Sequence, residues 1–231
     1  MKKIKVHSEL FYILAIILLA FSVAMLTAVD FGISMIVAPA FLLSEKVSFL
    51  TFGQSEYVIQ ALLFIVLCIL MKKVKLVYFS SFVTCLIYGA ILDLWRVAVP
   101  MFNPSVTTPG AFAFPLRIIL FIIGMVMSSV AIAMFFHVYL YPQVYDFFVK
   151  AVSERFKINR SKFKIGFDIS LFVISVIMSL LLFKGFVGIG IGTVIMTALN
   201  GLIIGFFDKL IEKYFTVIPA LPKFARHFEI N

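Results

Sequence analysis

The 231-residue sequence has little charge: 13% of its residues are Asp, Glu, Lys or Arg, and 63% are hydrophobic. A soluble domain is typically about a quarter charged and about half apolar, so this composition excludes an ordinary water-soluble domain. Cysteine is scarce as well. Cys68 and Cys85 lie in apolar runs without CxxC spacing or a nearby histidine, so neither a disulfide framework nor a zinc site is indicated.

Catalytic signatures are also missing from the sequence. It has no GxSxG, HExxH, Walker or dinucleotide-binding motif, and its three histidines are scattered along the chain. We therefore predict no enzyme activity, no metal and no cofactor.

Six long apolar runs dominate what is present. About 20 apolar residues span a bilayer as a helix, and a segment in lipid must satisfy its own backbone hydrogen bonds, so each run is predicted to be a membrane-spanning helix. The first run is longer than the apolar region of a signal peptide and has no clear cleavage site, which favours a retained helix. The runs cover residues 10–29, 57–71, 76–95, 117–140, 165–183 and 188–207.

The basic residues fall mainly on one side of these spans. The chain has 20 Lys and Arg against 11 Asp and Glu. With the N-terminus placed inside, only Lys46, Arg96, Arg117 and Lys184 lie outside, which follows the positive-inside rule and predicts that both termini are cytoplasmic. The positive charge therefore indicates orientation and contact with anionic lipid headgroups, and not a nucleic-acid partner.

Two apolar segments are too short or too mixed to span. Residues 33–43 surround Pro39 and are expected outside, whereas residues 138–156 contain Pro142 with aromatic and charged residues and are expected inside. Such lengths suit interfacial or re-entrant helices. The loop 96–116 contains four prolines and is predicted to be an irregular outer cap.

The order of these segments repeats within the chain. Each half reads long helix, short segment, long helix, long helix, and a shift of 112 positions places Glu56 on Asp168 and Gly89 on Gly201. We predict an all-α membrane domain over residues 1–231, with repeat one at about 8–100, repeat two at about 114–216 and a cytoplasmic tail at 217–231. Because each unit has three spans, the second must be inverted relative to the first, as in many secondary transporters.

Parts of the sequence resemble the YczE/YitT group of bacterial membrane proteins, including the branch classed as a domain of unknown function. The most specific part is GxGIGT followed by a small-residue helix, from Gly188 to Gly205. The family has a turn with a glycine and a proline after the first helix of each repeat. In the first repeat of this sequence Gly32 keeps the glycine, and Met35 stands where proline is usual. In the second repeat Pro142 is kept. The resemblance implies a bacterial cytoplasmic membrane protein and a suspected permease, without a substrate. The similar stretches are AVDFGISMIVAPAFLLSEKVSFLTFGQSEYVIQALLF, LVYFSSFVTCLIYGAILDLW and KIGFDISLFVISVIMSLLLFKGFVGIGIGTVIMTALNGLIIGFF.

Three carboxylates are candidate site residues. Ionisable groups cost about 2.5–3.5 kcal/mol at the centre of a membrane helix, so those that persist need a reason. Glu56 and Asp168 are expected at the starts of the second and fifth spans, either as gates or cation-binding groups or as charges that complement the helix dipole. Asp93 is a further candidate, although an ion pair with Arg96 or Arg117 is the simpler account.

Glycines open the last predicted span. Gly188, Gly190 and Gly192 could leave backbone N–H groups free for an anion, or could let two helices approach closely. Gly201 and Gly205 continue a small-residue face along the same helix, which favours close packing.

Asn200 is the most polar residue near the middle of the last span and is predicted to contact a ligand or another helix. Taken together, these features predict a small-molecule permease with a site between the repeats. Two alternatives stay open: an accessory membrane component that binds a protein partner or lipid, and a lipid-modifying enzyme, for which no His, Asp and Glu cluster is evident. A homo-oligomer is compatible with the permease and with the accessory component.

Overall fold

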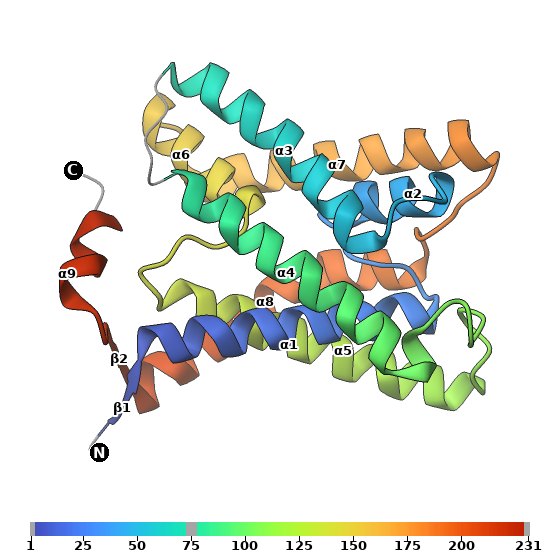
Figure 1. The fold of residues 1–231 in the computed structure, drawn as a ribbon, viewed down its shortest axis with the longest axis horizontal. Helices are drawn as coiled ribbons and strands as arrows, with labels where there is room; N and C mark the ends of the chain where they lie inside the picture. The colour runs from blue at the N-terminus through green and yellow to red at the C-terminus, as the bar shows by residue number, and fades with distance from the viewer. Residues whose placement is uncertain (1–2, 73–77, 229–231) are drawn as a thin grey trace.

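The fold is a bundle of helices, six of them long and apolar enough to cross a membrane (Figure 1). The computed structural model describes residues 3–72 and 78–228. Within them the predicted all-α membrane class and the six spans are confirmed. The long helices are α1 (Ser8–Val29), α3 (Phe52–Met71), α4 (Phe79–Ala98), α5 (Phe114–Phe136), α7 (Arg160–Phe183) and α8 (Ile191–Tyr214).

The bundle has two unlike ends. Both chain termini lie at one of them, here called the terminal end, and the loops 47–51, 99–113 and 184–190 lie at the other, the distal end (Figure 1). The distal loop 99–113 contains a 3-10 turn, η2 (Pro100–Phe102). All six long helices connect the two ends.

The two short segments fold as helices inside the bundle. Helix α2 (Ala38–Lys46) packs against α3 and α7, and helix α6 (Val144–Phe156) packs against the same pair. The Lys46 ammonium at the end of α2 donates to the Leu182 carbonyl oxygen, 2.9 Å away at the distal end of α7. Helix α6 instead runs toward the start of α7 at the terminal end (Figure 1). Both short helices thus pack against long helices of the bundle, one from each half of the chain.

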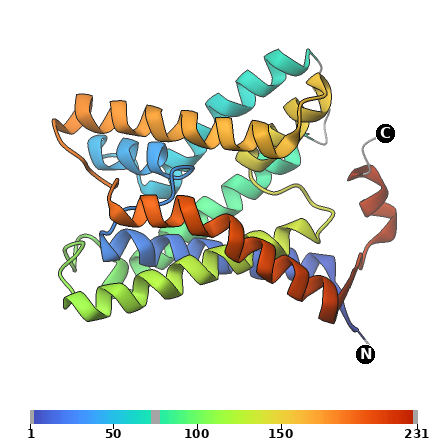
Figure 2. The same ribbon diagram turned by 180° about the vertical axis from the view of Figure 1, so that it is seen from behind.

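Helices α1 and α5 form a closely packed pair, and α3 and α7 lie apart from it. Small residues on α1, such as Ala15, Ala20 and Ala24, are fully buried, and they let α5 approach closely. Helix α4 packs on α1, and α8 packs on α5. Helices α3 and α4 also pack against each other, whereas α7 and α8 diverge toward the terminal end (Figure 2).

The terminal end carries structure that the sequence did not predict. Strand β1 (Ile4–His7) pairs in parallel with β2 (Phe215–Ile218), which follows α8 directly. Helix α9 (Pro222–Ala225) and the 3-10 turn η3 (Arg226–Phe228) follow. Hydropathy missed the strand pair because each strand has only four residues.

Several predicted boundaries are wrong by a turn or more. Helix α3 begins at Phe52 and not at 57, because Thr51 and Gln54 form a capping box. Helix α5 covers 114–136 and not 117–140, with Pro115 in its first turn. Helix α8 begins at 191 and ends at 214, a shift from the predicted 188–207. The predicted residues Lys2, Lys73 and Lys75 and the start of span 76–95 lie outside the described residues.

Candidate functional site

A buried polar cluster joins α3 to the start of α6. Gln60 Nε2 donates to Glu56 Oε2 and to Gln143 Oε1, both at 3.0 Å. The Tyr145 hydroxyl donates to the same Glu56 Oε2 at 3.1 Å, and the Val144 N–H donates to Gln60 Oε1 at 3.0 Å. Side chains from two helices far apart in the chain therefore surround one carboxyl group.

The early start of α3 places this carboxyl group inside the bundle. With the helix starting at Phe52, Glu56 lies beyond the first turn and is 0% exposed, as is Gln60 one turn later. The predicted position of Glu56 at a helix end, where a side chain can reach water, is therefore wrong. A charge in the first turn that complements the dipole is excluded for the same reason.

The surroundings of Glu56 are neutral. Tyr88 and Cys85 on α4 are buried beside α3, and the Cys85 thiol lies 3.9 Å from the Glu56 backbone oxygen. Glu56 Oε1 is buried without a hydrogen-bond partner, and so is Ser55 Oγ. Within the described chain no Lys or Arg forms an ion pair with Glu56. One carboxyl oxygen thus holds two donors while the other can still bind a proton or a ligand.

An interior cavity of about 60 Å³ borders this cluster. Its wall includes Gln143 and Tyr145 at the start of α6, and Ser34 and Val37 just before α2. Tyr88 on α4 completes the side next to the carboxyl group. Both short helices therefore begin at one cavity and run from it to opposite ends of the bundle. N-termini of helices carry partial positive charge, which adds to the polar side chains in a wall that is otherwise mainly apolar.

Asn200 borders the interior cavity from α8. Its Oδ1 accepts a hydrogen bond of 3.4 Å from the Ser129 hydroxyl on α5. The interhelical bond that the sequence predicted is therefore present, and the same side chain is open to a ligand in the cavity.

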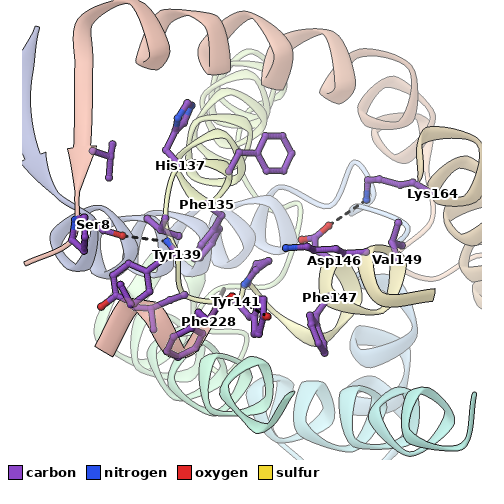
Figure 3. Close-up of a pocket in the computed structure, with 18 residues that line it drawn as sticks. Ser8, Phe135, His137, Tyr139, Tyr141, Asp146, Phe147, Val149, Lys164 and Phe228 are labelled. Atoms are coloured by element: carbon purple, nitrogen blue, oxygen red, sulfur yellow. Dashed lines mark hydrogen bonds and ion pairs between the residues drawn. The ribbon is translucent and has the colours of Figure 1, made fainter. Parts of the chain in front are cut away.

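A larger cavity of about 650 Å³ opens at the terminal end, between the α5–α6 connection and the C-terminal tail. Figure 3 shows Asp146 and Lys164 on one side of it, pointing toward each other, with 3.4 Å between Lys164 Nζ and Asp146 Oδ1. His137 Nε2, on its far side, lies 2.9 Å from Asp208 Oδ1. Asp146, Phe135 and Pro142 border both cavities, so the two spaces adjoin at the start of α6.

The carboxylate of Glu9 binds the C-terminal tail that borders this larger cavity. Glu9 accepts hydrogen bonds from the Ala220 N–H at 2.9 Å, the Leu221 N–H at 3.1 Å and the Tyr139 hydroxyl at 2.7 Å. Burial and the bond to Glu9 raise the pKa of Tyr139 to about 12, so its hydroxyl remains a donor at neutral pH.

Asp168 and Asp93 occupy different settings from Glu56. Asp168 Oδ1 lies 3.6 Å from Lys164 Nζ, so the carboxylate is part of the charged group at the terminal cavity. Asp93 accepts from the Thr51 hydroxyl and, at 2.8 Å, from the Gly53 N–H, which caps the start of α3. The predicted ion pair of Asp93 with Arg96 or Arg117 is therefore wrong.

The glycines before α8 pack against the segment between α1 and α2. The Gly192 N–H donates to the Phe31 carbonyl oxygen at 2.7 Å, and Gly188 accepts from the Ile33 N–H at 3.0 Å. A Cβ atom on Gly190 would lie 2.5 Å from the same Phe31 oxygen. The predicted close approach is present, and the amide groups that the alternative anion site needed at 190 and 192 are already bonded.

The small-residue face further along α8 is not packed. A Cβ atom on Gly201 or Gly205 would meet nothing within 4 Å. The prediction that these two glycines continue the packed face is therefore wrong for the single chain.

Metal binding has no geometric support in the residues described. No group of three or more His, Cys, Asp or Glu side chains in that part of the chain could hold a metal ion.

Comparison with known proteins identifies a family. The family of unknown function DUF6198 matches residues 6–209, which include all six long helices except the end of α8. The chain belongs to DUF6198. No curated protein and no solved structure matches it.

Three residues of the site in this DUF6198 chain were not predicted from the sequence: Gln60, Gln143 and Tyr145. Gln60 was detectable, because it is a second polar residue in the same span and lies four positions after Glu56, on the same face of a helix. Gln143 and Tyr145 gave no such signal, since they belong to a short segment whose depth in the bundle hydropathy does not define.

Proposed function

We propose that the chain is a small-molecule permease in which two inverted repeats expose the interior cavity alternately to the two sides of the membrane. The observation that carries this proposal is the meeting of α2 and α6, which begin at one cavity and run to opposite ends. Broken or short helices that meet near the middle of the bundle are typical of substrate sites in secondary transporters.

The packing supports the inverted repeats. If α1 to α4 correspond to α5 to α8, the contact of α4 with α1 matches that of α8 with α5, and the contact of α2 with α7 matches that of α6 with α3. Helices α3 and α7 also end alike, at Lys72 and Lys184, both with left-handed backbone φ angles of 52° and 57°. These matching contacts are what an inverted repeat of four helices would produce.

One pair of contacts breaks this correspondence. Helices α3 and α4 are packed together, whereas α7 and α8 diverge at the terminal end, where the large cavity opens. An inverted repeat that alternates between two states should differ in this way, with one half closed and the other open. We infer that the structure represents the state that is open at the terminal end.

We assign the terminal end to the cytoplasm. The basic residues support this orientation, because most of the described ones lie at the terminal end, among them Lys150, Arg155, Lys162 and Lys213. Of the described basic residues, the distal end has only Lys46, Arg96, Arg117 and Lys184. The open state is then inward-facing, in a bacterial cytoplasmic membrane.

The test is the accessibility of the interior cavity from both sides. Ser34→Cys places a thiol in its wall with little change in volume, and membrane-impermeant thiosulfonate reagents can be added to either side of oriented vesicles. The parent protein measures the background reaction of the two native cysteines. Cys85 is fully buried, and Cys68 is partly buried within α3. We expect reaction from both sides. Reaction from neither side, or from one side under every condition, would overturn the proposal.

A further inference from the structure

Glu56 has an environment that a structural carboxylate does not need. It is 0% exposed, its Oε2 atom accepts from both Gln60 and Tyr145, and its Oε1 atom has no partner. An ionised carboxylate in an apolar interior is costly unless a cation or several donors stabilise it, and a buried group without them binds a proton instead. The unpartnered oxygen is where that proton would bind.

Every element packed against this part of α3 presents neutral groups to Glu56. Helix α6 contributes Tyr145, and α4 contributes Tyr88 and Cys85. The charged residues on these elements have other partners or lie elsewhere. On α4, Asp93 caps the start of α3 and Arg96 stacks on Phe52; on α2, Glu45 and Lys46 lie at the distal end of the helix. On α6, Asp146 is paired with Lys164 where the two cavities adjoin, Lys150 lies over the Tyr141 ring, and Glu154 and Arg155 are exposed. No fixed cation in the described chain therefore holds Glu56 in its ionised form.

Polar side chains link Glu56 to the interior cavity. Tyr145 and Gln143 border the interior cavity, and Tyr145 bonds directly to the carboxyl group. The interior cavity adjoins the terminal cavity at Asp146. Carboxyl groups reached by such polar routes serve as proton relays in membrane pumps and transporters.

We propose that Glu56 is the proton-binding residue of the transport cycle. Its carboxyl group takes up and releases a proton through the interior cavity. One proton enters through the interior cavity from one side and binds to the carboxylate, and the carboxyl group releases it to the other side after the repeats change state. Protonation removes the charge at the start of α6, and so changes the interaction that joins α3 to α6. This inference rests on the proposed permease function.

The first test is infrared spectroscopy of the protein in liposomes during a pH titration. A protonated buried carboxyl group has a carbonyl stretch distinct from that of a carboxylate. We expect a band that appears as pH falls, is lost in Glu56→Gln and is kept in Glu45→Gln, a control at an exposed carboxylate. A band unchanged by Glu56→Gln overturns the proposal.

Two additions keep this test decisive. If Glu56→Gln does not fold, Glu56→Asp retains a carboxyl group at the position and must shift the band in frequency without abolishing it. The titration is also repeated at low and high sodium concentration. A midpoint that falls as sodium rises would identify the bound ion as sodium and overturn the assignment to a proton.

The second test links protonation to the change of state. The rates at which Ser34→Cys reacts from the two sides are measured across the same pH range. We expect their ratio to change at least several-fold, and to become independent of pH when Glu56→Gln is added. A ratio independent of pH in Ser34→Cys itself would overturn the role of Glu56 and leave the permease standing, whereas reaction from one side only would overturn the permease.

Discussion

At the scale of single residues, the decisive feature is the carboxyl group of Glu56, in which one oxygen accepts two hydrogen bonds and the other accepts none. Sequence reasoning selected Glu56 because it paired with Asp168 in the repeat, but it placed both near helix ends. The capping box at Thr51 extends α3 by about one turn and moves Glu56 into the interior, whereas Asp168 is paired with Lys164. A hydropathy pattern does not contain this difference, because it depends on where the helix begins.

The hydroxyl of Tyr145 contributes to the stability of this cluster. Tyr145→Phe removes one of two donors to Glu56 Oε2 and keeps the shape of the ring, so we expect a loss of about 1–3 kcal/mol in the free energy of unfolding. Thermal unfolding in detergent measures it. Tyr214→Phe is the control, because its ring contacts Lys213 and its hydroxyl has no hydrogen bond among the described residues; an equal loss in both variants would contradict the assigned bond.

At the scale of elements, the two short helices and the segments before them define the interior. Their existence could be predicted from the length of the apolar segments, but their form, interfacial or re-entrant, and their partners could not. Nothing in the local sequence indicates that Phe31 meets Gly190 and Gly192, or that Gly201 and Gly205 are left open. These contacts depend on how the two halves of the chain come together.

The glycines of α8 allow a matched comparison. Gly192→Ala would place a Cβ atom 2.7 Å from the Phe31 oxygen and from the Phe121 ring, so we expect a destabilisation of about 1–3 kcal/mol. Gly201→Ala meets nothing and replaces glycine in a helix, so we expect no loss, or a gain of up to about 1 kcal/mol. Thermal unfolding compares the two. Equal effects would show that the segments at Phe31 and Gly192 are not in contact.

The tail is expected to depend on Glu9. Glu9→Gln replaces a carboxylate that accepts from the Ala220 and Leu221 amides, and bonds to a charged acceptor are the stronger kind. We predict roughly tenfold faster hydrogen exchange at those amides, which corresponds to about 1.4 kcal/mol. Exchange within α1 should stay unchanged. Protection of the tail equal to that of the parent protein would mean that β1 and β2 hold it alone.

At the scale of the whole molecule, the number of spans, the fold class and the order of segments were predictable, since they follow from apolar length and the spacing of charges. The state of the molecule was not predictable. The divergence of α7 and α8 at one end and the packing of α3 on α4 are properties of one conformation.

The orientation has its own prediction. Ser105 lies in the distal loop, and Glu154 is exposed near the end of α6. In intact cells Ser105→Cys should react with an impermeant maleimide, and Glu154→Cys should react only after the membrane is opened. The reverse pattern would place the terminal end outside.

The central claim is that the two halves open in turn, and distances between spin labels test it most directly. One pair, Lys162→Cys with Lys209→Cys, reports the gap between α7 and α8 at the terminal end; the other, Val58→Cys with Val97→Cys, reports α3 and α4 at the distal end. In liposomes across a range of pH, the account predicts that the distal pair lengthens whenever the terminal pair shortens. Two distances that stay constant, or that change in the same direction, would contradict it.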